Sequence, residues 1–172
     1  MRVLTLLLVL SLAAAPLAHA QKGSIEIGTK AGVSLAIPGG GDTEVYIALP
    51  GTGALVLPSI YATFWATPAL MIEPQVLFSW NSATEEAWFS GVLQGGWMFS
   101  PQKRNSAYVA ADFGWLTLGG DIESALAGGG AGYRFRVGDG AGLRLEALYR
   151  RWLCDGCDLN EIIFAFGGGV VF

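Results

Sequence analysis

Glu161-Ile-Ile-Phe-Ala-Phe-Gly-Gly-Gly-Val-Val-Phe172 closes the chain and has the alternation of a β-strand. Successive side chains of a strand point to opposite faces, so one face of this stretch is bulky and apolar and the other carries smaller residues. The bulky face consists of Ile162, Phe164, Phe166, Val170 and Phe172. A closed barrel in a membrane accommodates such a face, because its outer surface meets hydrocarbon and closure leaves no unpaired strand edge.

The first 20 residues have the three parts of a secretory signal peptide. Met1-Arg2 supplies a positive charge, residues 3–15 are apolar, and Ala18-His19-Ala20 is a small-x-small cleavage motif. The apolar run is shorter than the roughly 20 residues of a spanning helix, which argues against a membrane anchor. We therefore expect residues 1–20 to be cleaved and residues 21–172 to form one exported domain.

Composition favours strands over membrane helices. Hydrophobic residues make up 52% of the chain, yet after residue 20 they occur in short alternating segments broken by Gly, Pro, Asp and Asn. This pattern is typical of a transmembrane barrel. The predicted fold is all-β, an eight-stranded antiparallel up-and-down transmembrane β-barrel. Its strands are expected near residues 25–37, 55–66, 70–80, 87–100, 107–118, 125–137, 143–153 and 161–172.

The predicted connections alternate between short turns and longer loops. Residues 67–69, 101–106 and 138–142 are short Gly/Pro or polar turns, whereas the intervening loops are longer and mostly acidic. In bacterial outer-membrane barrels the short turns and both termini lie on the periplasmic side. Residues 44–49 also alternate, and they either extend the first hairpin or belong to a ten-stranded barrel.

Charged residues of the predicted strands share one face. In residues 143–153, Arg144, Glu146 and Arg150 lie opposite Leu145 and Tyr149. An Arg or Lys that faces lipid at mid-bilayer costs about 2–4 kcal/mol, so the charged face is predicted to be the lumen. The predicted lumen residues are Glu26, Lys30, Glu73, Asp112, Arg134, Arg136, Arg144, Glu146 and Arg150.

These charges favour a plugged lumen. Five cations and four anions nearly balance, and an eight-stranded barrel is just wide enough inside for side chains to fill it. We interpret the set as a mutually paired polar plug, and the alternative is a narrow channel for small solutes or ions. A soluble lipocalin-like binder would reverse the pattern, with an apolar interior and a polar exterior.

Two strands and the C-terminus carry a family resemblance. Residues 27–35 (IGTKAGVSL) resemble the opening strand of the bacterial outer-membrane β-barrel domain family, and residues 70–78 (LMIEPQVLF) are similar to a strand that recurs in it. Phe164, Phe166, Val170 and Phe172 resemble its assembly signal. The resemblance implies a small OmpA/OmpX-like, porin-family-type barrel in the bacterial outer membrane. Its implied partners are outer-membrane lipid, lipopolysaccharide, periplasmic chaperones and the barrel-assembly machinery.

Catalysis is not expected. The only histidine, His19, belongs to the predicted signal peptide, so the mature chain lacks the imidazole of a Ser-His-Asp triad or a histidine metal site. Cys154-Asp-Gly-Cys157 has the spacing of a redox motif or half a zinc site. No further ligand and no helix accompany it, so an exported chain favours a local disulfide between Cys154 and Cys157. We expect no enzyme, cofactor or metal.

Charge is distributed unevenly along the chain. The net charge of −4 becomes −5 when Arg2 leaves with the signal peptide, which argues against nucleic-acid binding. Lys103 and Arg104 lie on a predicted periplasmic turn. The predicted outer loops hold Asp42, Glu44, Glu85, Glu86, Asp121, Glu123, Asp155, Asp158 and Glu161. The sequence thus predicts a monomeric outer-membrane barrel with a structural or surface-interaction (adhesin-like) role, or alternatively a narrow pore.

Overall fold

The computed structural model describes residues 23–48, 60–81, 86–118, 121–138, 140–153 and 159–172. The predicted signal peptide and the pair Cys154 and Cys157 lie outside these ranges. Within them, no helix is both long and apolar enough to cross a membrane. The strands are β1 (Ile25–Pro38), β2 (Glu44–Ala48), β3 (Ile60–Trp65), β4 (Leu70–Asn81), β5 (Glu86–Met98), β6 (Asn105–Leu118), β7 (Asp121–Val137), β8 (Ala141–Leu153) and β9 (Leu159–Val171).

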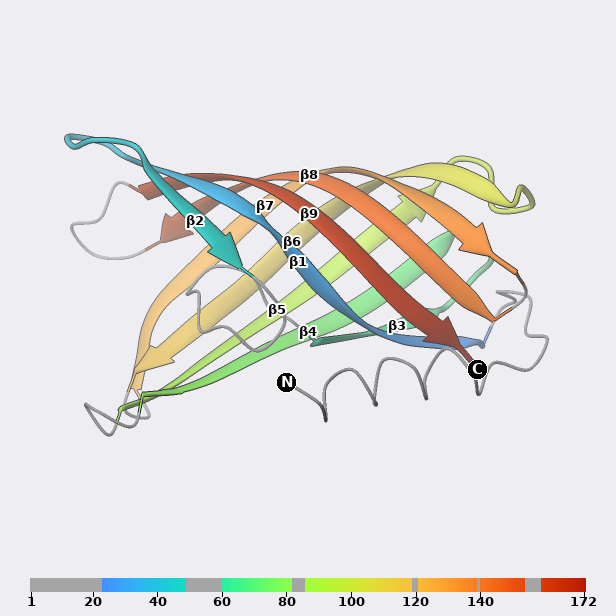
Figure 1. Ribbon diagram of the computed structural model, residues 1–172, viewed down its shortest axis with the longest axis horizontal. Coiled ribbons are helices and arrows are strands. Elements are labelled where there is room, and N and C mark those ends of the chain that lie inside the picture. The colour runs from blue at the N-terminus through green and yellow to red at the C-terminus, as the bar shows by residue number, and fades with distance from the viewer. Residues whose placement is uncertain (1–22, 49–59, 82–85, 119–120, 139, 154–158) are drawn as a thin grey trace.

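The strands close into an eight-stranded antiparallel barrel, as predicted (Figure 1). From β3 to β9 each strand pairs with the next, and β1 pairs with β3. β1 also pairs with β9 along nearly its whole length, from Glu26 opposite Val171 to Pro38 opposite Leu159. This last pairing closes the barrel.

β2 resolves the open question of the strand count. It pairs with β1 at residues 32–36, whereas β3 pairs with β1 at residues 25–29. Both are antiparallel to β1, and β9 occupies the opposite edge of β1. β2 and β3 therefore follow one another along the same edge of β1 and share the place of one barrel strand.

The two ends of the barrel differ. β1 starts and β9 ends at one end, where the backbones of Ile25 and Phe172 exchange hydrogen bonds of 3.2 and 2.8 Å. The β3–β4, β5–β6 and β7–β8 turns lie at this end, which we call the short-turn end, on the right in Figure 1. The β7–β8 turn needs glycine, because Gly138 has a φ of 67°, in the left-handed region. We call the opposite end the loop end.

The two faces of the wall also differ. Buried and exposed residues alternate strictly along β8, as expected for a strand between two different media. The outward residues of the described strands include large apolar side chains such as Leu93, Phe113 and Phe164, which are 49%, 57% and 54% exposed. The inward residues are largely polar and charged. This is the arrangement predicted for a membrane barrel and the reverse of a lipocalin-like binder.

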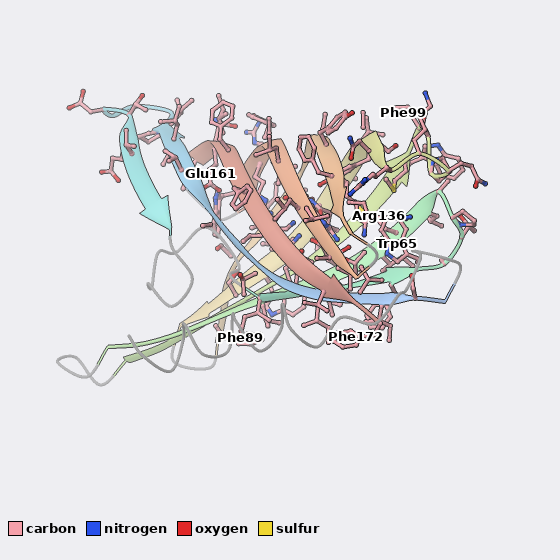
Figure 2. The ribbon with its side chains drawn as sticks, turned by 45° about the vertical axis from the view of Figure 1, so that its right-hand side comes forward. Trp65, Phe89, Phe99, Arg136, Glu161 and Phe172 are labelled. Atoms are coloured by element: carbon pink, nitrogen blue, oxygen red, sulfur yellow. The ribbon has the colours of Figure 1, made fainter. Side chains whose placement is uncertain are left out.

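Two apolar clusters adjoin the polar interior, one near each end. Near the short-turn end, Trp65 and Met71 pack with Met98 and Tyr108. Near the loop end the residues Val92, Leu126 and Trp152 form a second cluster, against which Leu159 packs. Figure 2 shows Trp65 toward the short-turn end and Glu161 toward the loop end.

Candidate functional site

The structure places eight of the nine proposed lumen residues in the barrel interior, each at most 5% exposed: Glu26, Lys30, Glu73, Asp112, Arg134, Arg144, Glu146 and Arg150. They come from five strands (β1, β4, β6, β7 and β8), and the narrow barrel brings them together. Arg136 differs, because it is only half-buried. It lies near the end of β7, where its carbonyl accepts a hydrogen bond of 3.0 Å from Arg104 Nε.

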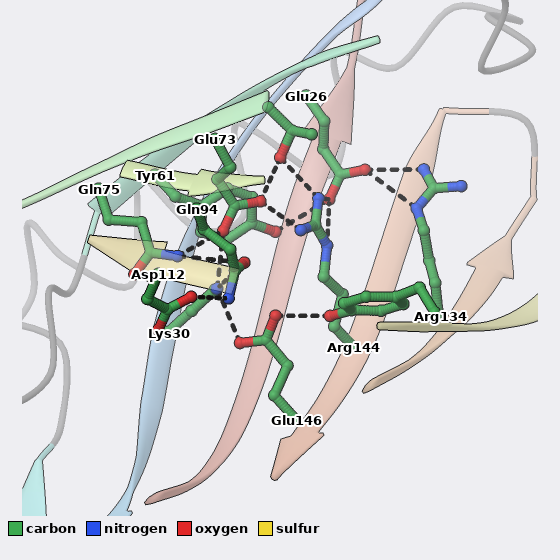
Figure 3. Close-up of polar contacts among 12 residues, drawn as sticks. Glu26, Lys30, Tyr61, Glu73, Gln75, Gln94, Asp112, Arg134, Arg144 and Glu146 are labelled. Carbon is green, nitrogen blue, oxygen red and sulfur yellow. Dashed lines mark hydrogen bonds and ion pairs between the residues drawn. The ribbon is translucent and has the colours of Figure 1, made fainter. Parts of the chain in front are cut away.

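Arg144 lies at the centre of the network (Figure 3). Its Nη2 lies 2.7 Å from Glu26 Oε1, and its Nη1 is ion-paired with Glu73. Arg144 also donates a hydrogen bond of 2.7 Å to Thr63 Oγ1. The other oxygen of Glu26 lies 2.7 Å from Arg134 Nη2. One guanidinium therefore links two carboxylates, and one of these carboxylates links two arginines.

Lys30 joins two further carboxylates. Its Nζ lies 2.7 Å from Glu73 Oε1 and 2.7 Å from Glu146 Oε2. Gln75 donates to Glu73 Oε1 at 2.8 Å. Gln94 accepts from Lys30 at 3.4 Å and donates to Asp112 Oδ1 at 3.0 Å. The amides thus connect the lysine to the next ion pair.

Toward the loop end, the network includes an ion pair between Arg150 and Asp112. Arg150 Nε lies 2.8 Å from Asp112 Oδ2. Each of the carboxylates in the network therefore faces a cation within ion-pair distance. Pairing of this kind offsets the large desolvation penalty of a buried charge, and removing one partner typically costs about 3–5 kcal/mol.

Two buried tyrosines complete the network, and sequence analysis missed both. Tyr61 donates to Glu26 Oε1 at 2.9 Å, and Tyr108 donates to Glu146 Oε1 at 2.5 Å. The guanidinium of Arg144 lies 4.6 Å from the ring centre of Tyr61. Residues without a formal charge gave no signal except inward parity, which requires the strand limits and register.

Glycines make room for these rings. A Cβ on Gly132 would lie 2.3 Å from Tyr108 Cζ, and one on Gly169 would lie 2.7 Å from the Tyr61 hydroxyl. Real Cβ atoms essentially never approach so closely. Glycine at these points of the wall therefore lets a full aromatic ring lie across a narrow lumen.

Glu161 corrects one sequence-based assignment. Sequence analysis grouped it with the acidic outer loops, but it is buried at 1% exposure. It accepts hydrogen bonds from the Ser34 hydroxyl and from Trp152 Nε1, the latter at 3.4 Å. The physical reason is parity, because Glu161 lies on β9 and shares the inward face with Ile163. Counting it, the buried charges among the described residues are five acids and four bases.

The carboxylates of the network are already engaged. Each ion-paired carboxylate among the described residues also accepts a hydrogen bond from a neighbouring side chain. Across the ranges described above, no group of three or more His, Cys, Asp or Glu side chains could hold a metal ion. The arrangement suits a rigid, polar filling of the barrel.

Comparison with known proteins gives structural matches only. No family model matches the sequence, and no curated protein matches it. The structure is similar to Neisserial surface protein A, with a TM-score of 0.61 and 13% identity over 86% of this chain and 98% of that one. It is also similar to the N-terminal β-barrel domain of Pseudomonas aeruginosa OprF, with a TM-score of 0.58 and 13% identity over 88% and 98%.

A third similar structure is Ail, the attachment invasion locus protein of Yersinia pestis, with a TM-score of 0.52 and 14% identity over 88% of this chain and 100% of that chain. At this level of identity the likeness concerns the fold. The chain therefore has the fold of the small eight-stranded outer-membrane β-barrels.

Proposed function

We propose that this chain is an outer-membrane β-barrel with a plugged, non-conducting lumen, which contributes to envelope integrity and presents its loop end at the cell surface. The observation that carries the proposal is the buried ion-pair network centred on Arg144, which lies across the interior of the barrel. The apolar outer face supports membrane insertion, because a soluble protein rarely leaves so many large apolar side chains exposed.

The surface role is inferred from the loop end. Asp42 and Glu44 are exposed there, and the short-turn end has the features of a periplasmic face. Two of the similar proteins are described as a surface protein and as an attachment invasion locus protein. Export by a cleaved signal peptide, assembly by the barrel machinery and a monomeric state belong to the same proposal, and no catalysis is included.

Conductance in planar bilayers tests the plug. The refolded mature chain should give no stable discrete openings. The double variant Arg144→Ala, Glu73→Ala removes two partners from the centre of the network and should increase water access. Heat-modifiable migration on a gel establishes that each sample is a folded barrel. Stable wild-type openings that grow in the double variant would instead support the narrow channel.

Surface display is tested by topology. An epitope inserted between Gly40 and Gly41 should be accessible to antibody on intact cells. The same epitope inserted between Gln102 and Lys103 should become accessible only after the outer membrane is permeabilised. The reverse labelling pattern would contradict the proposed orientation.

A further inference from the structure

The outer face of the barrel contains an apolar groove of about 730 Å³ across β7, β8, β9 and β1. Large side chains form its walls, among them Tyr133, Leu145 and Phe166. Its floor consists of small residues that include Ala131 and Ala147. The lining is almost wholly apolar, so the groove suits a hydrocarbon chain.

A basic turn lies at the short-turn end, next to β7, which is one of the strands that line the groove. Lys103 and Arg104 are exposed on the β5–β6 turn at the short-turn end. Arg104 Nε donates to the carbonyl of Arg136, and the amide of Arg136 donates to the carbonyl of Arg104 at 3.1 Å. These two bonds dock the turn onto β7.

No exposed Asp or Glu side chain offsets these cations among the described residues of the short-turn end. Glu26, the acid nearest that end on β1, is fully buried and paired with Arg134 and Arg144. The exposed acids Asp42 and Glu44 lie at the opposite end. Among the described residues, the exposed charges of the β5–β6 turn are thus basic, whereas exposed acids lie at the loop end.

β7 connects the turn to the groove. Tyr133 lies three residues before Arg136, which is about 10 Å along a strand. One leaflet of the hydrocarbon core is about 15 Å thick, so the groove lies within the depth that an acyl chain covers from a headgroup at this rim. The ring centres of Tyr133 and Phe135 lie 4.8 Å apart, and these two rings continue the apolar surface from the rim to the groove.

We propose that the basic turn and the groove form one site for an anionic phospholipid of the periplasmic leaflet, such as phosphatidylglycerol. Lys103 and Arg104 would bind the headgroup phosphate, which both residue types recognise well. One acyl chain would lie in the groove over Ala131 and Ala147. A second copy of the chain is the alternative occupant of the groove, and the binding experiment below distinguishes it from lipid.

Native mass spectrometry of the refolded mature chain tests this site. Purified protein is titrated with phosphatidylglycerol and, separately, with phosphatidylcholine of the same acyl chains. Wild type should bind phosphatidylglycerol more tightly. Lys103→Gln with Arg104→Gln should weaken phosphatidylglycerol binding by about five-fold for each cation removed and leave phosphatidylcholine binding nearly unchanged.

The groove is tested separately by Ala147→Leu, which fills its floor. This variant should weaken binding of both lipids. The matched controls are Arg151→Gln, which removes an outward cation near the loop end, and Ala111→Leu, which enlarges an outward residue of β6 outside the groove. Neither control should change binding, and heat-modifiable migration checks that all variants fold.

Several results would overturn the site. Equal wild-type affinity for the two lipids would remove the headgroup contact, as would an unchanged affinity in the Lys103 and Arg104 variant. Loss of lipid adducts on adding inorganic phosphate would reduce the site to a phosphate-binding turn. Dimers that disappear in Ala147→Leu would assign the groove to a second copy.

Discussion

At the scale of single residues, the interior is held together by shared partners rather than by isolated pairs. Glu26 binds two arginines, and Arg144 binds two glutamates. Groups in one such network do not contribute additively, because removing one changes the balance around all the others. The central residue should therefore matter more than any peripheral one.

Arg144→Ala is expected to destabilise the folded barrel by about 3–5 kcal/mol, because it leaves Glu26 and Glu73 short of a cation in a desolvated interior. Urea unfolding of the protein in lipid vesicles measures the change. Arg151→Ala, in which the lost cation is exposed on the outer face of β8, is the control and should shift stability far less. Equal losses in the two variants would show that the network is not the stabilising feature.

Gly132→Ala is expected to destabilise the barrel by about 1–3 kcal/mol through overpacking, since the new methyl group would meet the ring of Tyr108. Gly95→Ala is the matched control, because nothing lies within 4 Å of the Cβ it would add. The double variant Gly132→Ala, Tyr108→Leu should lose less stability than the sum of the two single losses, because removing the ring also removes its clash with the new methyl group. Strict additivity of the two losses would refute the contact.

At the scale of strands, β9 combines two tasks. Its inward residues help fill the lumen, and Phe164 and Phe166 are about half-exposed on the outer face. Phe172 follows the strand, and its backbone is bonded in both directions to Ile25. The side chain of Phe172 is 59% exposed, and the hydrogen bonds that join the end of the chain to β1 come from its backbone.

Phe172→Ser should consequently separate assembly from stability. In cells, the variant should reach the outer membrane at a reduced level, because the proposed assembly signal is weakened. In vitro, it should refold into lipid vesicles to nearly the wild-type yield, because the backbone bonds to Ile25 remain. Cell fractionation and heat-modifiable migration are the two measurements, and an equal loss in both would assign Phe172 a role in folding.

The strand scale also shows how far sequence reasoning extends. Parity identified the inward side of β8, because Arg144, Glu146 and Arg150 carry charges that lipid would reject. It did not reveal that β2 and β3 share one edge of β1, since pairing depends on contacts between distant segments. Glu161 was misassigned for a related reason, because one position at a strand end decides between loop and lumen.

At the scale of the whole molecule, the barrel has a polar interior and an apolar exterior, which is the reverse of a soluble globular protein. The interior holds ion pairs and amides, and the exterior holds exposed aromatic and aliphatic side chains. Apolar side chains gather in two clusters near the ends of the interior, whereas ion pairs and amides occupy the region between these clusters. Specific polar contacts and the closed strand pairing therefore define the middle of the interior.

This reversal makes a depth-dependent prediction. Phe113→Arg, near the middle of the outer face of β6, should destabilise the barrel in lipid vesicles by about 2–4 kcal/mol. Phe99→Arg, beyond the end of β5 at the short-turn rim, should cost about 0–1 kcal/mol, because the guanidinium reaches the headgroups. Both phenylalanines are exposed, at 57% and 63%, so the same substitution is compared at two heights. Equal and small effects at both positions would mean that the apolar outer face does not lie in a bilayer.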